Sequence, residues 1–210
     1  MPSIEQARAW YRTDDPVHGF DHILRVLRLA ERIAEAEGAD MEIVRAAALL
    51  HDASGGDATQ GGRAAHQHAS ADFAREVLSA EGWEEKRIEA VRHCIRAHRF
   101  RGDEAPGTLE AQILFDADKL DVLGAFGVAR TIAYAVEAGQ PIYAQPSERF
   151  MAKGEEEPGE AHSVYHEYLF KLAIIKDRLH TESAKALAEA RHHLLVAFFE
   201  QLHAEAQGEA

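Results

Sequence analysis

The sequence predicts an all-α protein, and three observations support this class. Nearly every long segment carries apolar residues at the 3.6-residue period of an amphipathic helix. Strand-like alternation is almost absent, and β-branched residues are sparse and scattered. The 210 residues are 46% hydrophobic and 28% charged, which is an ordinary globular composition. We therefore expect a single helical domain over residues 1–210, with one cooperative core.

Two helices are predicted in the first forty residues. Ser3 and Gln6 have the spacing of a capping box for a short first helix, and Asp15 and Pro16 are typical of the start of a second. Gly38 is a candidate C-cap for this second helix. Its apolar stripe is formed by Phe20, Ile23, Leu24, Leu27, Ala30, Ile33 and Ala34.

The third predicted helix begins at the cap residue Asp40 and ends in polar residues. Its apolar run stops at Leu50, where His51 and Asp52 follow directly. A glycine-rich loop over 54–62 comes next.

The remaining helices complete the predicted domain, whose core covers 16–138. Helices are expected over 64–80, 84–97 and 108–138. The segment 139–162 contains three prolines and an acidic run, and we expect an irregular connection there. The C-terminal part, 163–206, is expected to form two closing helices, over 163–179 and 181–206.

Charge and cysteine content narrow the classes of function. The net charge of −13 argues against a nucleic-acid polymer or an acidic membrane as partner, because both need a basic surface. Cys94 is the lone cysteine, so an intramolecular disulfide is excluded. The first ten residues do not resemble a secretory signal, and no apolar run approaches the roughly eighteen residues of a membrane span. We expect a cytoplasmic protein, either a monomer or a homodimer.

Residue types that bind metals interrupt the apolar helix faces. An unpartnered imidazole or carboxylate in a core costs about 2 kcal/mol or more. Asp118 lies four residues after Leu114 and therefore falls in or beside the apolar stripe of its helix. A divalent cation would satisfy several such groups together. The four places are His18 to His22, His51 with Asp52, His66 to His68, and Asp116 to Asp121.

Three blocks of sequence carry a family resemblance. The stretches DHILRVLRLA, AALLHDAS and ILFDADKLDVLGAFGVAR occur in this order and contain a His, then His-Asp, then Asp. They resemble the HD-domain metal-dependent phosphohydrolase superfamily, in particular a bacterial branch of uncharacterised HD proteins. The resemblance implies a compact helical bundle whose metal site lies in the core between helices.

The resemblance implies a ligand set for one divalent ion. It places His22, His51, Asp52 and Asp118 on the metal. Two imidazoles and two carboxylates suit Mn, Fe, Mg, Co, Ni or Zn, so the identity of the ion stays open. The implied chemistry is attack of a metal-activated water on phosphorus.

Several residues are candidates for proton transfer. Asp52 is a candidate to accept the proton of the attacking water, although a carboxylate already on a metal is a poor base. His18 and His66 are further candidates, and Lys119 completes the group expected to act in catalysis. The sequence leaves open which of the five histidines near the motifs belong to the active site: His18, His66, His68, His93 and His98.

Other polar residues near the motifs are candidates for supporting roles. Asp21, Asp116 and Asp121 are placed to hydrogen-bond ligands, and Asp121 is equally suited to pair with Arg130. Arg25, Arg63 and Lys119 are the expected substrate-binding cations. The loop 54–62 has the flexibility of a lid or phosphate cradle but lacks the P-loop pattern.

The sequence thus predicts a metal-dependent phosphohydrolase that acts on a small phosphorylated metabolite, with a nucleotide as the leading candidate. Cleavage of a phosphomonoester and of a pyrophosphate bond both remain open. Two alternatives use the same scaffold. One is a catalytically silent HD module that binds a nucleotide, and the other is an HD-type oxygenase with a di-iron centre.

Overall fold

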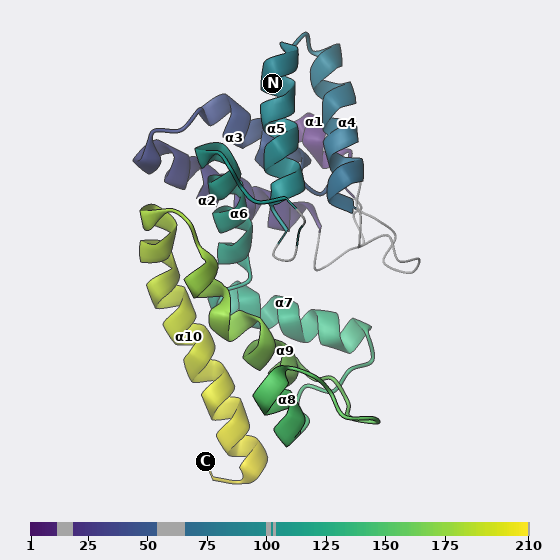
Figure 1. The fold of residues 1–210 in the computed structure, drawn as a ribbon, viewed down its shortest axis with the longest axis vertical. Helices are drawn as coiled ribbons and strands as arrows, with labels where there is room; N and C mark the ends of the chain where they lie inside the picture. The colour runs from purple at the N-terminus through teal and green to yellow at the C-terminus, as the bar shows by residue number, and fades with distance from the viewer. Residues whose placement is uncertain (12–18, 54–65, 100–101, 103, 210) are drawn as a thin grey trace. The chain divides into compact units, whose positions relative to one another are not determined.

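The structure is a computed structural model that describes residues 1–11, 19–53, 66–99, 102 and 104–209. These residues form helices and connections, without a β-strand among them, so the all-α class is confirmed (Figure 1). Within this part of the chain, no helix has the length and apolarity to cross a membrane. The helices are α1 (Ile4–Arg8), α2 (Phe20–Glu37), α3 (Met41–Leu50), α4 (His66–Ala80), α5 (Glu85–Ala97), α6 (Leu109–Asp121), α7 (Gly124–Glu137), α8 (Glu148–Lys153), α9 (Val164–Phe170), the 3-10 helix η2 (Leu172–Arg178) and α10 (Glu182–Gln207).

The chain divides into two compact units. The first unit contains Met1–Leu120 and Leu179–Ala184, and the second contains Asp121–Arg178 and Lys185–Ala210. All the predicted metal ligands lie in the first unit. The expectation of a single domain stays a prediction.

Helix α3 is the centre of the first unit. It packs against α1, α2, α4 and α5, and α4 also packs against α5 (Figure 1). Seven of its ten residues are buried, because the run from Ala46 to Leu50 is apolar on every face. Burial of this run fixes where the helix ends and therefore where His51 and Asp52 lie.

Most of the predicted caps in the first unit are confirmed. Ser3 and Gln6 form the capping box of α1, and the side chain of Asp40 accepts two backbone N–H groups at the start of α3. Gly38 ends α2 with a φ of 73°, a left-handed conformation that glycine adopts at little cost. The predicted cap at Asp15 and Pro16 lies outside the described residues, and α2 begins at Phe20.

The prediction of one helix over 108–138 is wrong. Helix α6 ends at Asp121 and α7 begins at Gly124, whose φ is 69°. The chain also turns so sharply here that a Cβ on Gly127 would lie 2.2 Å from the carbonyl oxygen of Val122. Apolar residues continue across this break on both sides, so periodicity alone did not reveal it.

The second unit departs from prediction in two further places. The connection over 139–162 contains helix α8, which Ser147 caps and which buries Phe150. The predicted helix over 163–179 is divided into α9 and η2 at Lys171, whose φ and ψ of −129° and −55° are not helical. Within this unit α7 packs against α9, and α9 against η2.

Candidate metal centre

Three helices of the first unit bring His22, His51 and Asp118 together. His22 lies in the first turn of α2, His51 is the C-cap of α3, and Asp118 belongs to α6. Each offers one ligand atom, and these atoms lie within 4.8 Å of one another. The distance from Nε2 of His22 to Oδ1 of Asp118 is 3.4 Å. Both histidines are buried, so the group lies inside the unit.

A second group of possible ligands consists of Asp52, His66 and His98. One ligand atom from each lies within 4.8 Å of the other two. Oδ1 of Asp52 is 3.3 Å from Nε2 of His66 and 3.6 Å from Nε2 of His98. His66 is the first residue of α4 and His98 is the C-cap of α5, so these two packed helices converge on Asp52.

The two groups are neighbours because His51 and Asp52 are consecutive. Nε2 of His51 lies 3.7 Å from Oδ2 of Asp52. The His51 ring lies between two others, with centroid distances of 5.6 Å to His22 and 5.2 Å to His98. Of the predicted ligands, Asp52 thus stands beside His51 but is grouped with two histidines that the predicted set did not include.

Hydrogen bonds to the backbone fix the tautomers of His51 and His98. Nδ1 of His51 donates to the carbonyl oxygen of Ala48 over 2.8 Å, and Nδ1 of His98 donates to that of Ile95 over 2.5 Å. A carbonyl oxygen only accepts, so Nδ1 carries the proton in each ring. In the neutral imidazole Nε2 then has a lone pair, which is the form that binds a metal.

Charge in the cluster is set by burial and by close neighbours. Burial lowers the pKa of His51 to about 4, although the negative charge of Asp52 opposes this shift. Burial alone would raise the pKa of Asp52, but the neighbouring His51, and then His66 and His98, hold it well below the usual value. At neutral pH a neutral ring therefore faces an ionised carboxylate.

These residues fit a divalent cation. The buried Nε2 of His51 has no hydrogen-bond partner among the described residues. A lone pair that faces carboxylate oxygens is repelled by them unless a positive charge lies between. Two histidines and two aspartates around this point offer nitrogen and oxygen ligands of the kind that Mn, Fe, Co, Ni or Zn accept.

Lys119 supports Asp118 at the edge of the cluster. Its Nζ lies 2.5 Å from Oδ2 of Asp118 and 5.2 Å from the centre of the Phe115 ring. Burial opposes ionisation of Asp118, but the charge of Lys119 and then the hydrogen bond from His22 hold its pKa well below the usual value. Helix α6 is buried along nearly all of its length, which places both side chains inside the unit.

The structure separates the remaining histidine candidates. His66 lies in the cluster, whereas His68 is exposed. His98 lies in the cluster, whereas His93 is held elsewhere by Glu104. His18 lies outside the described residues.

His98 shares a signal with His51 that sequence reasoning did not use. Each histidine directly follows the apolar end of a helix, after Leu50 in α3 and after Ala97 in α5. Each also bonds its own helix three residues back. A histidine at a helix C-cap, directly after a buried apolar residue, was therefore a sign in the sequence that the two cluster histidines share.

The predicted cations and supporting aspartates have varied positions. Arg25 is half-buried on α2, and Arg63 lies outside the described residues, as does the loop 54–62.

The three aspartates predicted to support the ligands differ in burial and partners. Asp21 is exposed. Asp116 is buried and accepts hydrogen bonds from the backbone of residues 180 and 181, where it anchors the segment before α10. Within the second unit, Asp121 pairs with Arg130 over 2.7 Å, one of the two roles expected for it.

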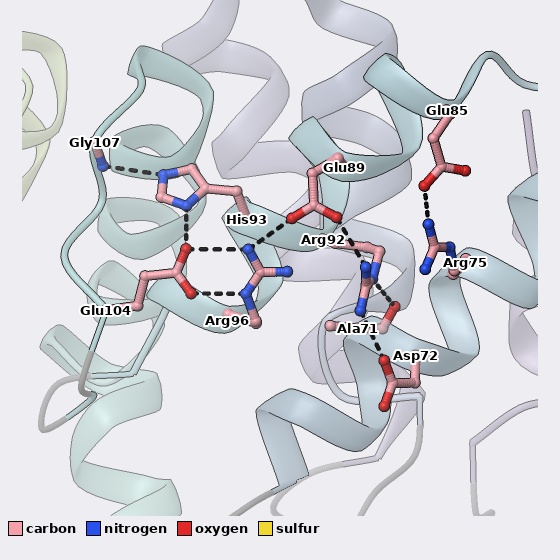
Figure 2. A network of polar contacts seen from close by, with 10 residues as sticks. All are labelled: Ala71, Asp72, Arg75, Glu85, Glu89, Arg92, His93, Arg96, Glu104 and Gly107. Carbon is pink, nitrogen blue, oxygen red and sulfur yellow. Dashed lines mark hydrogen bonds and ion pairs between the residues drawn. The ribbon is translucent and has the colours of Figure 1, made fainter.

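A polar network holds the chain that follows α5 against that helix (Figure 2). His93 donates from Nδ1 to Glu104 over 2.5 Å and accepts the backbone N–H of Gly107 at Nε2. Arg96 binds both oxygens of Glu104, with its Nε 2.7 Å from Oε2, and also reaches Glu89. These contacts lie beside the helix end that carries the cluster histidine of α5.

A second part of the network joins α5 to α4. Arg92 donates to the backbone carbonyl of Ala71 over 3.1 Å and to Asp72 over 2.8 Å (Figure 2). Arg75 and Glu85 form a further pair between the same two helices. The two helices that converge on Asp52 are thus tied by side chains as well as by apolar packing.

The fold and the cluster define a helical protein with a candidate metal centre built from histidines and aspartates. Residues 19–123 match the family model described as the HD domain. This match covers half of the chain, so the protein belongs to the HD-domain family, a superfamily composed mostly of hydrolases.

Relatives of known sequence and structure agree with this assignment. The uncharacterized protein YpgQ of Bacillus subtilis is 31% identical over 99% of this chain and 96% of its own length. Its crystal structure in complex with ADP superposes with a TM-score of 0.76 at 29% identity, over 99% of this chain and all of that one. An HD-superfamily hydrolase from Bacillus thuringiensis gives a TM-score of 0.69 at 29% identity, over 97% and 94% of the two chains.

Proposed function

We propose that the protein is a metal-dependent phosphohydrolase that acts on a small phosphorylated metabolite, and that this metabolite is a nucleotide. One observation carries the proposal. The Nε2 lone pairs of His51 and His98 face the carboxylate of Asp52 inside a buried cluster, an arrangement that calls for a cation. The crystal structure of YpgQ with ADP supports a nucleotide as the substrate class.

The proposed ligands of one divalent ion are His22, His51, Asp52 and Asp118. When bound, such an ion supplies Lewis acidity and lowers the pKa of water. The protein's contribution is to hold the ligands in place. The backbone carbonyl of Ala48 orients the His51 ring, and Lys119 holds the carboxylate of Asp118.

His66 is the proposed group for proton transfer. Its side chain is 20% exposed, more than those of the other histidines in the cluster, so it is reached from solvent. Its Nε2 lies 3.3 Å from Oδ1 of Asp52, which allows the ring to pass a proton while the carboxylate stays ionised. His18 is retained as a second proposed acid or base.

Three cations are proposed to bind the substrate phosphate. Lys119 is the best placed, because its ammonium group lies next to Asp118 at the edge of the cluster. Arg25 follows His22 by about one turn of α2, and Arg63 is proposed from its position after the glycine-rich loop. In a chain with a net charge of −13, a phosphorylated substrate needs such local positive charge.

The decisive experiment is a substrate screen on protein that is stripped with a chelator and reloaded separately with Mn, Mg, Co, Ni or Zn. Nucleoside mono-, di- and triphosphates and generic phosphoesters are tested for release of phosphate or pyrophosphate. We expect turnover with at least one metal and its loss in His51→Ala and Asp118→Ala, with helical circular dichroism retained. Undiminished hydrolysis in both folded variants would contradict the mechanism, and tight nucleotide binding without product would favour a silent binding module.

A di-iron oxygenase is the second candidate, and the second group of ligands favours it. Asp52, His66 and His98 lie directly beside the first group, as two neighbouring metals would require. Metal analysis separates the candidates. About one ion per chain with hydrolysis supports the phosphohydrolase, whereas two irons with a coupled electronic signature and no hydrolysis support the oxygenase.

A further inference from the structure

A tyrosine outside the HD match reaches the end of α3. Tyr11 follows the short helix α1 and is buried, with 9% of its surface exposed. Its hydroxyl donates to the carbonyl oxygen of Leu49 over 2.8 Å, across 38 positions of sequence. The HD match begins at residue 19, so nothing in that match assigns a role to this side chain.

The contact completes the hydrogen bonding at the end of α3. An α-helix leaves its last four carbonyl groups without partners inside the helix. His51 binds the carbonyl of Ala48 with its own ring, and the carbonyl of Leu50 accepts a backbone N–H three residues on. The carbonyl between them, that of Leu49, has Tyr11 as its donor. Two of these three donors belong to the turn that directly follows α3. The third, Tyr11, comes from a distant segment of the chain, after α1.

Tyr11 also lies beside Asp52 and beside the start of α2, the helix that carries His22. Burial raises the pKa of Tyr11 well above its usual value, the negative charge of Asp52 raises it further, and the backbone N–H of Asp52 at the phenolic oxygen opposes both. The ring of Tyr11 packs against Phe20, with 5.6 Å between the ring centres. Phe20 precedes His22 by two residues in α2.

We propose that Tyr11 is a positioning residue of the metal centre, which holds the end of α3 so that His51 and Asp52 face His22 and Asp118. This inference rests on the metal site of the proposed function. The Tyr11 hydroxyl fixes the backbone of the turn that carries His51 and Asp52, and the Tyr11 ring sets the distance from that turn to α2. The hydroxyl is bonded to a backbone carbonyl in a buried place, so its action is through the ligands and not on substrate.

The test is the affinity of the chelator-stripped, full-length protein for Mn²⁺ alone, measured by calorimetry. Tyr11→Phe keeps the ring against Phe20 and removes only the hydroxyl. We expect its Kd for Mn²⁺ to rise about tenfold or more, as for other residues that orient metal ligands. Tyr143→Phe is the matched control, because that hydroxyl bonds Gln145 and His203 in the second unit, and its Kd is expected to match the wild type.

A second measurement separates positioning from general stabilisation. The visible absorption of bound Co²⁺ reports ligand geometry, and we expect it to change in Tyr11→Phe but not in Tyr143→Phe. A Tyr11→Phe protein with a lower Tm in the absence of metal, but an unchanged Kd and Co²⁺ spectrum, would overturn the inference. If the wild type binds none of Mn²⁺, Mg²⁺, Co²⁺, Ni²⁺ and Zn²⁺, the inference and the proposed function both fail. If the wild type and Tyr11→Phe bind Mn²⁺ equally well and give the same Co²⁺ spectrum, only the inference fails.

A further variant tests whether the hydroxyl or the ring matters. Phe20→Leu loosens the ring contact and leaves the bond from Tyr11 to Leu49 in place. We expect a smaller rise in the Kd for Mn²⁺ than in Tyr11→Phe. An equal or larger rise would place the effect in packing and would overturn the role of the hydroxyl.

Discussion

Nε2 of His98 lies 3.6 Å from Oδ1 of Asp52, and in the neutral ring neither atom carries a proton for the other. His51 stands in the same relation to the second oxygen of this carboxylate, at 3.7 Å. Two buried rings thus turn lone pairs towards one anion. A cation between them converts this repulsion into binding, and the following predictions test the arrangement around it.

His98→Ala should lower turnover about tenfold or more, because it removes a buried group that faces Asp52. His68→Ala is the matched control, since His68 is exposed on α4. The measurements are kcat/KM with a hydrolysed nucleotide and the metal content of the purified protein. A larger loss of kcat/KM in His68→Ala than in His98→Ala would show that His68, and not His98, acts in the site.

Lys119→Met should reduce kcat/KM for a phosphorylated substrate about tenfold or more, because the lost charge lies beside Asp118 and is proposed to bind phosphate. Lys86→Met changes an exposed lysine of α5 and should have no effect. Inhibition by inorganic phosphate gives an independent measurement and should weaken in Lys119→Met. Unchanged inhibition would argue against direct phosphate binding by Lys119.

Arg92→Ala should lower the free energy of unfolding by about 1–2 kcal/mol, because its charged hydrogen bonds to Ala71 and Asp72 join α4 to α5. Arg75→Ala breaks a pair between the same helices whose side chains are 48% and 62% exposed, and should cost about 0.5 kcal/mol or less. Urea denaturation of both variants measures the difference. Equal losses would mean that burial does not distinguish the two contacts.

Glu160 should make the second unit sensitive to acid. The backbone N–H of Glu157, then His166 and the backbone N–H of Ser147, lower the pKa of Glu160 from 4.5 to about 2. A carboxyl with a lower pKa in the folded state stabilises the protein above the unfolded value and loses this effect as the pH falls through the folded one. The stabilisation of the folded state by ionised Glu160 should therefore be complete above pH 4.5 and disappear as the pH falls towards 2.

Urea denaturation of the wild type and Glu160→Gln at pH 7 and pH 3 tests this dependence. We expect Glu160→Gln to be less stable than the wild type at pH 7 and closer to it at pH 3. Glu137→Gln, at an exposed position in the same unit, should follow the wild type at both values. If the difference in unfolding free energy between Glu160→Gln and the wild type were the same at both pH values, titration of this carboxyl would not be its cause.

Helices and their caps could be predicted where the signal is local. The capping box at Ser3, the cap at Asp40 and the left-handed Gly38 each depend on a few adjacent residues, and each was confirmed. The break between α6 and α7 could not be predicted in this way. It depends on Gly124 in a left-handed conformation and on the close approach of Gly127 to the backbone of Val122, inside an apolar pattern that continues on both sides.

The sequence by itself determined the helical class, the burial of the helix that ends just before His51, and membership of the HD-domain family. These features follow from residue type and short spacing. Only the tertiary structure decided that His66 and His98, and not His68 or His93, converge on Asp52, and that Tyr11 reaches the end of α3. The physical reason is that such contacts join residues far apart in the chain, and the packing of α1, α3, α4 and α5, not any local pattern, sets their distances.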